Sequence, residues 1–75
     1  MSEALKTLEI RLKNHTDKQF IYYVKSHWLE SKKQPLLDML EELDLEFDKS
    51  ESMDTLIVKF RKEITDYILE AYYNG

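Results

Sequence analysis

The sequence has 75 residues, enough for one small domain with a modest hydrophobic core. Its apolar share of 43% and charged share of 35% are typical of a folded chain rather than a disordered one. The absence of cysteine excludes disulfide bonds, zinc–thiolate sites and thiol catalysis, and the single glycine, at the last position, excludes phosphate-binding loops that need several glycines. We expect a single domain over residues 1–75.

The net charge of −4 is unevenly distributed along the chain. Residues 1–35 carry seven Lys or Arg against four Asp or Glu, whereas residues 36–75 carry four against eleven. Such polarisation indicates partner binding rather than chemistry. No apolar run approaches the roughly 18 residues that span a bilayer, and the N-terminus lacks the apolar region of a secretory signal. We expect a cytoplasmic protein with no membrane partner.

The first predicted element covers residues 3–14. Its leucines fit one face of a helix, with Ser2 as the N-cap, but Leu8, Ile10 and Leu12 also alternate as in a strand. The only candidate partner strand is the alternating stretch 43–47. Because a lone strand would leave its backbone groups unpaired, we favour the helix.

The second predicted element is a helix over residues 17–32. Thr16 and Gln19 have the spacing of a capping box, in which each side chain accepts a hydrogen bond from the backbone amide of the other. Apolar residues then recur every three to four positions, which predicts one buried stripe. The stripe comprises Phe20, Ile21, Val24, His27 and Trp28.

Two further helices are predicted over residues 35–46 and 53–72. Pro35 suits the first position of a helix, and leucines at 36, 37, 40 and 43 form its apolar face. Residues 48–52 form the connection, and the last helix carries an apolar stripe of more than five turns, from Met53 to Ala71. The expected fold is therefore an all-α bundle of three or four helices.

The stretches LLDMLEELDLEF (residues 36–47) and MDTLIVKF (residues 53–60) resemble the helix-extended loop-helix modules of the SAP, HeH and LEM type. The resemblance implies two helices joined by a short loop, with DNA as the partner of many SAP modules and a protein as the partner of LEM modules. The segment departs from the SAP pattern at Asp44, where a turn residue such as glycine is common, and in being acidic rather than basic. These departures weaken the implication of DNA binding.

No catalytic, cofactor or metal site is predicted. The sequence lacks the HExxH motif, the nucleophile elbow and the Walker loop, and its two histidines, His15 and His27, share no obvious third ligand. The oxygen donors between Asp44 and Glu51 lack the glycine and the closing glutamate of an EF-hand loop. We expect a protein that is not an enzyme.

Three surfaces remain as candidate binding sites. The first is an acidic protein-binding surface formed by Asp38, Glu41, Glu42, Asp44, Glu46, Asp48 and Glu51. The second is a basic helix face for nucleic acid, formed by Lys18, Tyr22, Lys25 and Lys32. Leu29 lies on the same helix face, and Lys33 adds a further cation next to Lys32. The third is a second apolar stripe on the last helix that could form a homodimer interface, with Val58, Lys62, Thr65, Leu69 and Tyr73.

The acidic surface gives the leading prediction of function. We expect a small regulator or inhibitor, of the kind that phages and other mobile elements encode, which binds a protein partner with a basic surface. Two alternatives stay open. One is a nucleic-acid-binding module that uses the basic helix face, and the other is a structural subunit of a helical homo-oligomer.

Overall fold

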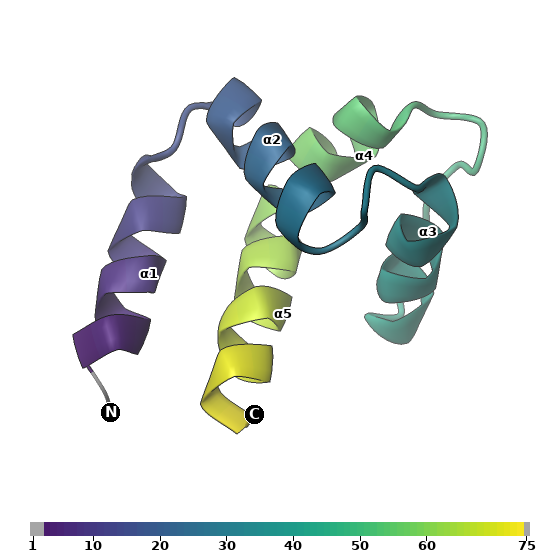
Figure 1. Cartoon of the computed structure of the whole chain (residues 1–75). Coiled ribbons are helices and arrows are strands. Elements are labelled where there is room, and N and C mark those ends of the chain that lie inside the picture. The colour runs from purple at the N-terminus through teal and green to yellow at the C-terminus, as the bar shows by residue number, and fades with distance from the viewer. Residues whose placement is uncertain (1–2, 75) are drawn as a thin grey trace.

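The computed structural model describes residues 3–74, and all its regular structure is helical. The helices are α1 (Glu3–Asn14), α2 (Asp17–His27), α3 (Lys33–Glu42), α4 (Met53–Lys59) and α5 (Arg61–Asn74). The all-α prediction is confirmed, but the described residues form five helices rather than three or four. In Figure 1, α5 runs through the middle of the molecule, with α1 on one side and α3 on the other.

The first element is a helix, so the alternative of a strand over residues 7–13 is wrong. Leu12 is fully buried and Leu8 half-buried, but Ile10 is 53% exposed, so the alternation of apolar residues does not mark a buried face. Helix α1 packs along α5, as Figure 1 shows, which gives its leucines a partner. The predicted N-cap Ser2 lies outside the described residues.

Helix α2 begins as predicted and ends earlier. The Thr16 hydroxyl accepts from the Gln19 amide at 3.1 Å, and the Gln19 side chain accepts from the Thr16 amide at 2.9 Å, which confirms the capping box. The helix ends at His27 rather than at residue 32, because Glu30 and Ser31 take left-handed angles (φ 51° and 58°) that no α-helix continues through. The early end carries Leu29 into the core, where it is 1% exposed.

Helix α3 is shorter than predicted at its C-terminus and longer at its N-terminus. It begins at Lys33, which makes Pro35 the third helical residue instead of the first. Proline is tolerated there because the first four backbone N–H groups of a helix have no intrahelical acceptor. The helix ends at Glu42 rather than at residue 46, and the connection to α4 is correspondingly long, spanning residues 43–52.

The predicted helix over residues 53–72 is interrupted at Phe60, whose backbone angles (φ −108°, ψ 28°) end α4. No glycine or proline marks the break, and the apolar stripe continues across it. The bend directs Leu56 and Ile57 of α4 and Ile64 of α5 into the same core. The periodicity is therefore compatible with one helix or with two.

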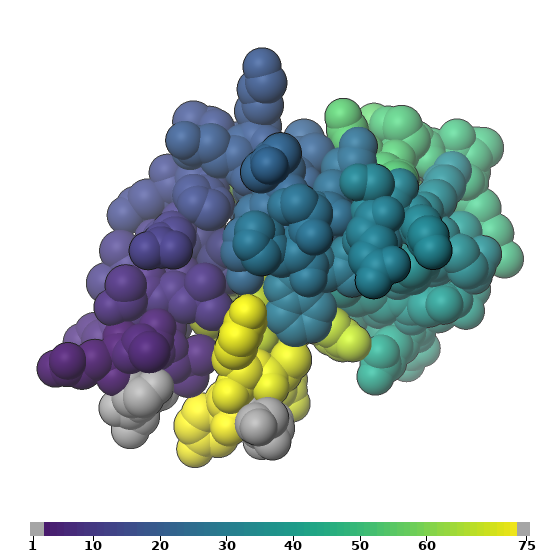
Figure 2. All heavy atoms as spheres, in the orientation of Figure 1, coloured from purple at the N-terminus to yellow at the C-terminus, as the bar shows by residue number. Residues whose placement is uncertain are grey.

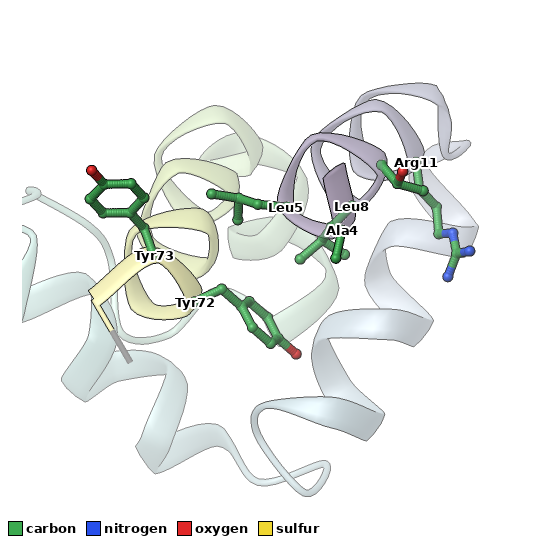
Figure 3. A pocket seen from close by; sticks show the side chains of 7 residues that line it. Ala4, Leu5, Leu8, Arg11, Tyr72 and Tyr73 are labelled. Carbon is green, nitrogen blue, oxygen red and sulfur yellow. The ribbon is translucent and has the colours of Figure 1, made fainter. Parts of the chain in front are cut away.

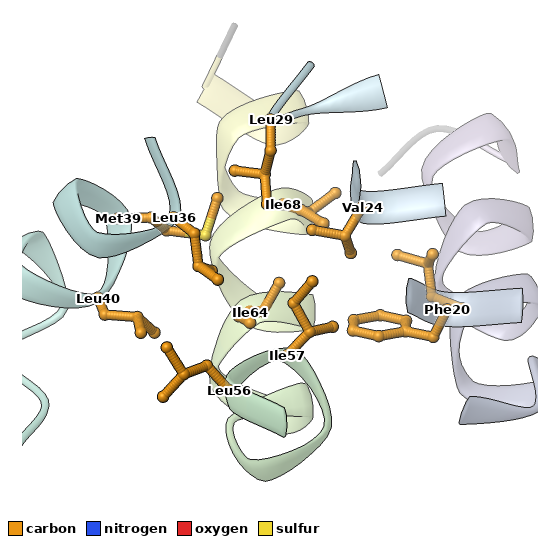
Figure 4. Close-up of a cluster of buried hydrophobic side chains, with 11 residues drawn as sticks. Phe20, Val24, Leu29, Leu36, Met39, Leu40, Leu56, Ile57, Ile64 and Ile68 are labelled. Carbon is orange, nitrogen blue, oxygen red and sulfur yellow. The ribbon is translucent and has the colours of Figure 1, made fainter. Parts of the chain in front are cut away.

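The core draws fully buried side chains from all five helices and forms one cluster. Figure 4 shows residues of α3 facing those of α2 across the central pair α4 and α5. Its members are Leu12, Phe20, Val24, Leu29, Leu36, Met39, Leu40, Leu56, Ile57, Ile64 and Ile68. Because burial of one such side chain stabilises the fold by about 1.5–3 kcal/mol, this cluster is the main source of stability.

Arg61 joins the helices at the side opposite α3. Its guanidinium donates to the Asp17 carboxylate at 2.8 Å, to the carbonyl of Leu12 at 2.9 Å and to the carbonyl of His15. The same group lies 4.8 Å from the centre of the Phe20 ring. One side chain at the start of α5 therefore fixes the α1–α2 turn by satisfying carbonyls at the end of α1.

Candidate binding surfaces

The acidic surface is formed by one continuous stretch of chain. Helix α3 carries Asp38, Glu41 and Glu42, the loop carries Asp44, Glu46 and Asp48, and Glu51 precedes the Ser52 cap of α4. Six of these residues are exposed, and Glu51 is half-buried. Lys49 is the only Lys or Arg within residues 38–51. The predicted carboxylates thus lie on consecutive structural elements and remain open to solvent.

The end of α3 turns the chain so that these carboxylates stay outside. Asp44 adopts a left-handed conformation (φ 62°), its amide donates to the Glu41 carbonyl, and the Leu45 amide donates to the Leu40 carbonyl. These are the two hydrogen bonds of a Schellman motif, in which an aspartate takes the place usually held by glycine. Leu45 packs against the core, so its two acidic neighbours in the sequence are left exposed.

Several of these carboxylates have partners within the chain. Glu41 lies 4.0 Å from Lys49, Glu51 lies 3.6 Å from Lys59, and Glu42 accepts a hydrogen bond from the Tyr67 hydroxyl at 3.2 Å. Asp38 accepts a hydrogen bond from the Gln34 amide at 2.9 Å. The side chains of Asp44 and Glu46 have no such partner among the described residues. Exposed pairs of this kind contribute little to stability, and the surface keeps a large negative excess.

Asp48 is held in its charged form by the loop itself. Its carboxylate accepts from the hydroxyl and the amide of Ser50, at 2.7 and 2.8 Å, and these hydrogen bonds lower the pKa of Asp48 below its ordinary value. The same bonds hold the loop in a tight turn.

The predicted basic helix face is not assembled as one stripe. Lys18 and Tyr22 are exposed on α2, but Lys25 donates to Asp54 of α4 at 3.1 Å. Lys32 and Lys33 lie beyond the end of α2, and the Lys33 ammonium donates to the carbonyl of Lys49. Because α2 ends at His27, the helical spacing that aligned these residues does not extend to positions 32 and 33.

The residues of the predicted dimer stripe are divided between α4 and α5. Thr65 is buried, and its hydroxyl donates to the Arg61 carbonyl, while Leu69 packs against the core. Val58, Lys62 and Tyr73 are exposed. Since α1 packs along α5, the chain itself covers part of this stripe. A homodimer through the exposed members remains a prediction.

Two of the grooves beside α1 contain aromatic side chains. The first, the α1–α5 groove, has a volume of about 680 Å³ and is lined by Ala4, Leu5, Thr7, Leu8, Arg11, Tyr72 and Tyr73. Figure 3 shows Tyr72 directed into the space between α5 and the neighbouring helices and Tyr73 directed away from it. In the space-filling view, the surface is hollowed between α1 and the end of α5 (Figure 2). This groove is mostly apolar.

The second groove, the α1–α2 groove, has a volume of about 560 Å³ and lies between the end of α1 and the outer face of α2. Its lining consists of Arg11, His15, Thr16, Lys18, Gln19, Tyr22, Tyr23 and His27. Arg11 lines both grooves and, in Figure 3, extends from α1 towards α2. The sequence analysis identified only Lys18 and Tyr22 as binding residues here. Gln19, Tyr23 and His27 lie on the same helix, whereas Arg11 joins them only because of the turn between α1 and α2.

His27 was expected on the buried stripe and is instead exposed. Its ring stacks on Tyr23, with ring centres 4.8 Å apart, and its Nδ1 atom lies 3.1 Å from the Ser26 hydroxyl. His15 is half-buried, and its Nδ1 atom is enclosed without a hydrogen-bond partner. Trp28 fills the expected place on the inner side, packed against the core.

Within residues 3–74, no three His, Asp or Glu side chains come close enough together to hold a metal ion. Over the same residues, no helix combines the length and the apolar character needed to cross a bilayer. The segment that resembles SAP-type modules folds as helix, loop and helix, and its kinship with those modules stays a prediction. Comparisons with protein-family models, curated proteins and solved structures found no match to this chain.

Proposed function

We propose that this protein is a non-enzymatic regulator that binds a basic surface of a protein partner through its acidic surface. The observation that carries the proposal is the concentration of seven carboxylates within residues 38–51, six of them exposed, with Lys49 as the only cation among them. Regulation or inhibition would follow from occupying the basic surface that the partner uses for another ligand.

The charge of this surface supports recognition at a distance as well as contact. Clustered charge of one sign attracts an opposite surface and raises the rate of association, an effect that salt weakens. The internal ion pairs of Glu41 and Glu51 are long, at 4.0 and 3.6 Å, and at least one side chain of each pair is exposed, so a partner's cations can compete for these carboxylates at little cost. Asp44 and Glu46 form no ion pair with another described residue, so none has to be broken.

The shape of the surface favours a protein partner that brings Arg or Lys side chains. Carboxylates on a helix and on its exit loop present acceptors in several directions, which suits the planar fork of arginine. The α3 helix is held by Leu36, Met39 and Leu40 in the core, so the backbone that carries the carboxylates of its outer face is already in place. A backbone that is ordered before binding loses less entropy on binding.

A charge-reversal experiment tests the proposal. The variant E41K/E42K/E46K changes the net charge by six units within the acidic surface, and the control E3K/E30K/D66K changes it by the same amount at exposed sites elsewhere. Each protein is immobilised as bait, and retained proteins are quantified by mass spectrometry at about 150 mM salt. We expect partners that the wild type and the control retain and the first variant loses.

The same experiment can overturn the proposal. If the two variants retain the same partners in the same amounts, the acidic surface does not select the partner. Circular dichroism of both variants establishes that helix content is intact before retention is compared. Elution of the partner by salt, with recovery on dilution, would identify the interaction as electrostatic.

A further inference from the structure

We propose that the α1–α2 groove binds single-stranded nucleic acid, with nucleobases stacked on its aromatic rings and phosphates paired with Arg11 and Lys18. This surface is separate from the acidic surface. The inference does not depend on the function proposed above, and the two can fail independently.

The lining of the groove differs from the rest of the chain in charge. Fifteen of the 75 residues are Asp or Glu, yet the residues that line the groove include none. They include two permanent cations, two histidines and two tyrosines (Arg11, Lys18, His15, His27, Tyr22 and Tyr23). An acidic protein that collects these groups in one hollow presents a local site for an anion with planar, apolar parts.

The cations of the groove are also free to bind a ligand. Most Lys and Arg side chains of this protein pair with a carboxylate or a carbonyl, as Lys25 does with Asp54 and Arg61 with Asp17. Among the described residues, Arg11 and Lys18 have no such side-chain partner, and both are exposed. His15 lines the same groove, although its Nδ1 atom is enclosed.

The aromatic rings offer surfaces for stacking. Tyr22 is 72% exposed, the largest exposure among the large apolar and aromatic side chains of the described residues. Tyr23 and His27 line the same groove and stack on each other, with an angle of 23° between their planes. Aromatic side chains next to cations are the usual means by which proteins hold single strands without sequence preference.

These features favour a single strand over two other anionic partners. Bases within a duplex are already stacked and cannot lie on Tyr22, and a long duplex would also approach the acidic surface, which repels it. An acidic protein would use the cations but leave the tyrosine ring without a planar partner. Of these anionic ligands, only an unpaired nucleotide segment uses both the rings and the charges.

Fluorescence anisotropy with a labelled oligothymidine of about 12 nucleotides tests the proposal, since sites of this kind cover about 4–16 nucleotides. We expect Tyr22→Ala to weaken binding roughly tenfold and Tyr22→Phe to retain it, because the ring stacks and the hydroxyl does not. The slope of the logarithm of affinity against the logarithm of salt should fall by about 0.7 for each of Arg11→Ala and Lys18→Ala. Lys62→Ala, an exposed cation outside the groove, is the matched control.

Three results would overturn the proposal. The first is no binding of the oligonucleotide at about 50 mM salt, where phosphate contacts are strong. The second is equal binding of a poly-glutamate peptide or of a duplex, which would show that charge alone is recognised. The third is an equal loss of affinity with Tyr22→Ala and Tyr22→Phe.

Because Arg11, Lys18 and Tyr22 are exposed, these variants should fold, and circular dichroism checks that they do. The variant E41K/E42K/E46K should keep the dependence of binding on Tyr22.

Discussion

The acidic surface and the α1–α2 groove are built in different ways. The acidic surface comes from one stretch, residues 38–51, and needs only the end of one helix and the loop that follows. The groove combines Arg11 of α1 with Tyr22 of α2 and exists only where those helices meet. Local sequence is therefore enough to form the first surface, whereas the second also depends on the contacts of Arg61 that hold the α1–α2 turn.

The largest effect is expected from Arg61→Ala. The substitution removes three hydrogen bonds and the contact with the Phe20 ring, and it leaves the carbonyls of Leu12 and His15 without this donor. We expect the free energy of unfolding to fall by about 3 kcal/mol, measured by urea denaturation. Oligonucleotide binding in the groove should weaken as the α1–α2 turn loosens, while capture through the acidic surface persists in the folded protein.

Arg61→Lys is the control for charge. Lysine keeps the positive charge but cannot reach a carboxylate and two carbonyls at once, because it lacks the planar fork of arginine. We expect it to recover only a minor part of the lost stability. A change of less than about 0.5 kcal/mol for Arg61→Ala, which is the size of an ordinary surface substitution, would show that this side chain does not hold the helices together.

A smaller effect on the groove side is expected from Thr16→Ala. The substitution removes the hydroxyl of the capping box at the start of α2 and leaves the Gln19 amide without its acceptor. Such losses cost about 1 kcal/mol of protein stability. Thr16→Ser, which keeps the hydroxyl, should restore most of it in the same thermal or urea measurement. Equal loss in both variants would indicate that packing of the threonine methyl group, and not the cap, is responsible.

On the acidic side, Asp44→Gly should stabilise the protein. The left-handed conformation of Asp44 is higher in free energy for a residue with a Cβ atom than for glycine. We therefore expect the free energy of unfolding, measured by urea denaturation, to rise by about 0.5–1 kcal/mol. The same change removes one carboxylate and should weaken partner capture. Glu46→Gln removes a neighbouring charge without changing a left-handed residue, and it should leave stability within about 0.5 kcal/mol. A loss of stability in Asp44→Gly would contradict the argument.

Features that depend on neighbouring residues in the chain could be predicted from the sequence, and features that depend on tertiary contacts could not. The capping box of Thr16 and Gln19 and the acidic cluster depend on residues close together in the chain. The structure confirms the capping box and leaves six of the seven carboxylate side chains exposed, although α3 ends before Asp44 and Glu46. The break at Phe60 could not be predicted, because the apolar period continues through it and no glycine or proline signals it. The spacing of apolar residues also predicted too long a helix at α2. This spacing carries no information on the left-handed backbone angles of Glu30, which lie beyond the end of the helix.

The groove is lined by residues 11–27, but the turn between α1 and α2 is held by contacts with a distant part of the sequence. Arg61 bonds to groups 44 to 49 positions away, at Leu12, His15 and Asp17, and no local pattern in the chain indicates these partners. A signal was nevertheless present in Tyr22 and Tyr23, two adjacent tyrosines on an amphipathic helix, of which at most one can face the core. The other had to lie at the surface, next to whichever helix packed there.

The smallest expected effect concerns the contact between the acidic surface and α5. Burial raises the pKa of Tyr67, and the carboxylate of Glu42, 3.2 Å from its hydroxyl, raises it further by disfavouring the phenolate. A folded-state pKa above the unfolded value means that the folded protein holds the proton more tightly. The contribution to stability is therefore complete below pH about 10 and is lost as the pH rises beyond that value. Burial raises the pKa of Tyr23 in the same direction.

Urea denaturation at several pH values between 8 and 11 measures this loss. We expect the free energy of unfolding to fall above pH about 10, and to fall less in Tyr67→Phe, which has no proton to lose. Glu42→Gln should lower the pKa of Tyr67, seen in the absorbance of the phenolate, because it removes the nearby negative charge. An identical decline in Tyr67→Phe and wild type would mean that the acidic surface and α5 are not coupled through this contact.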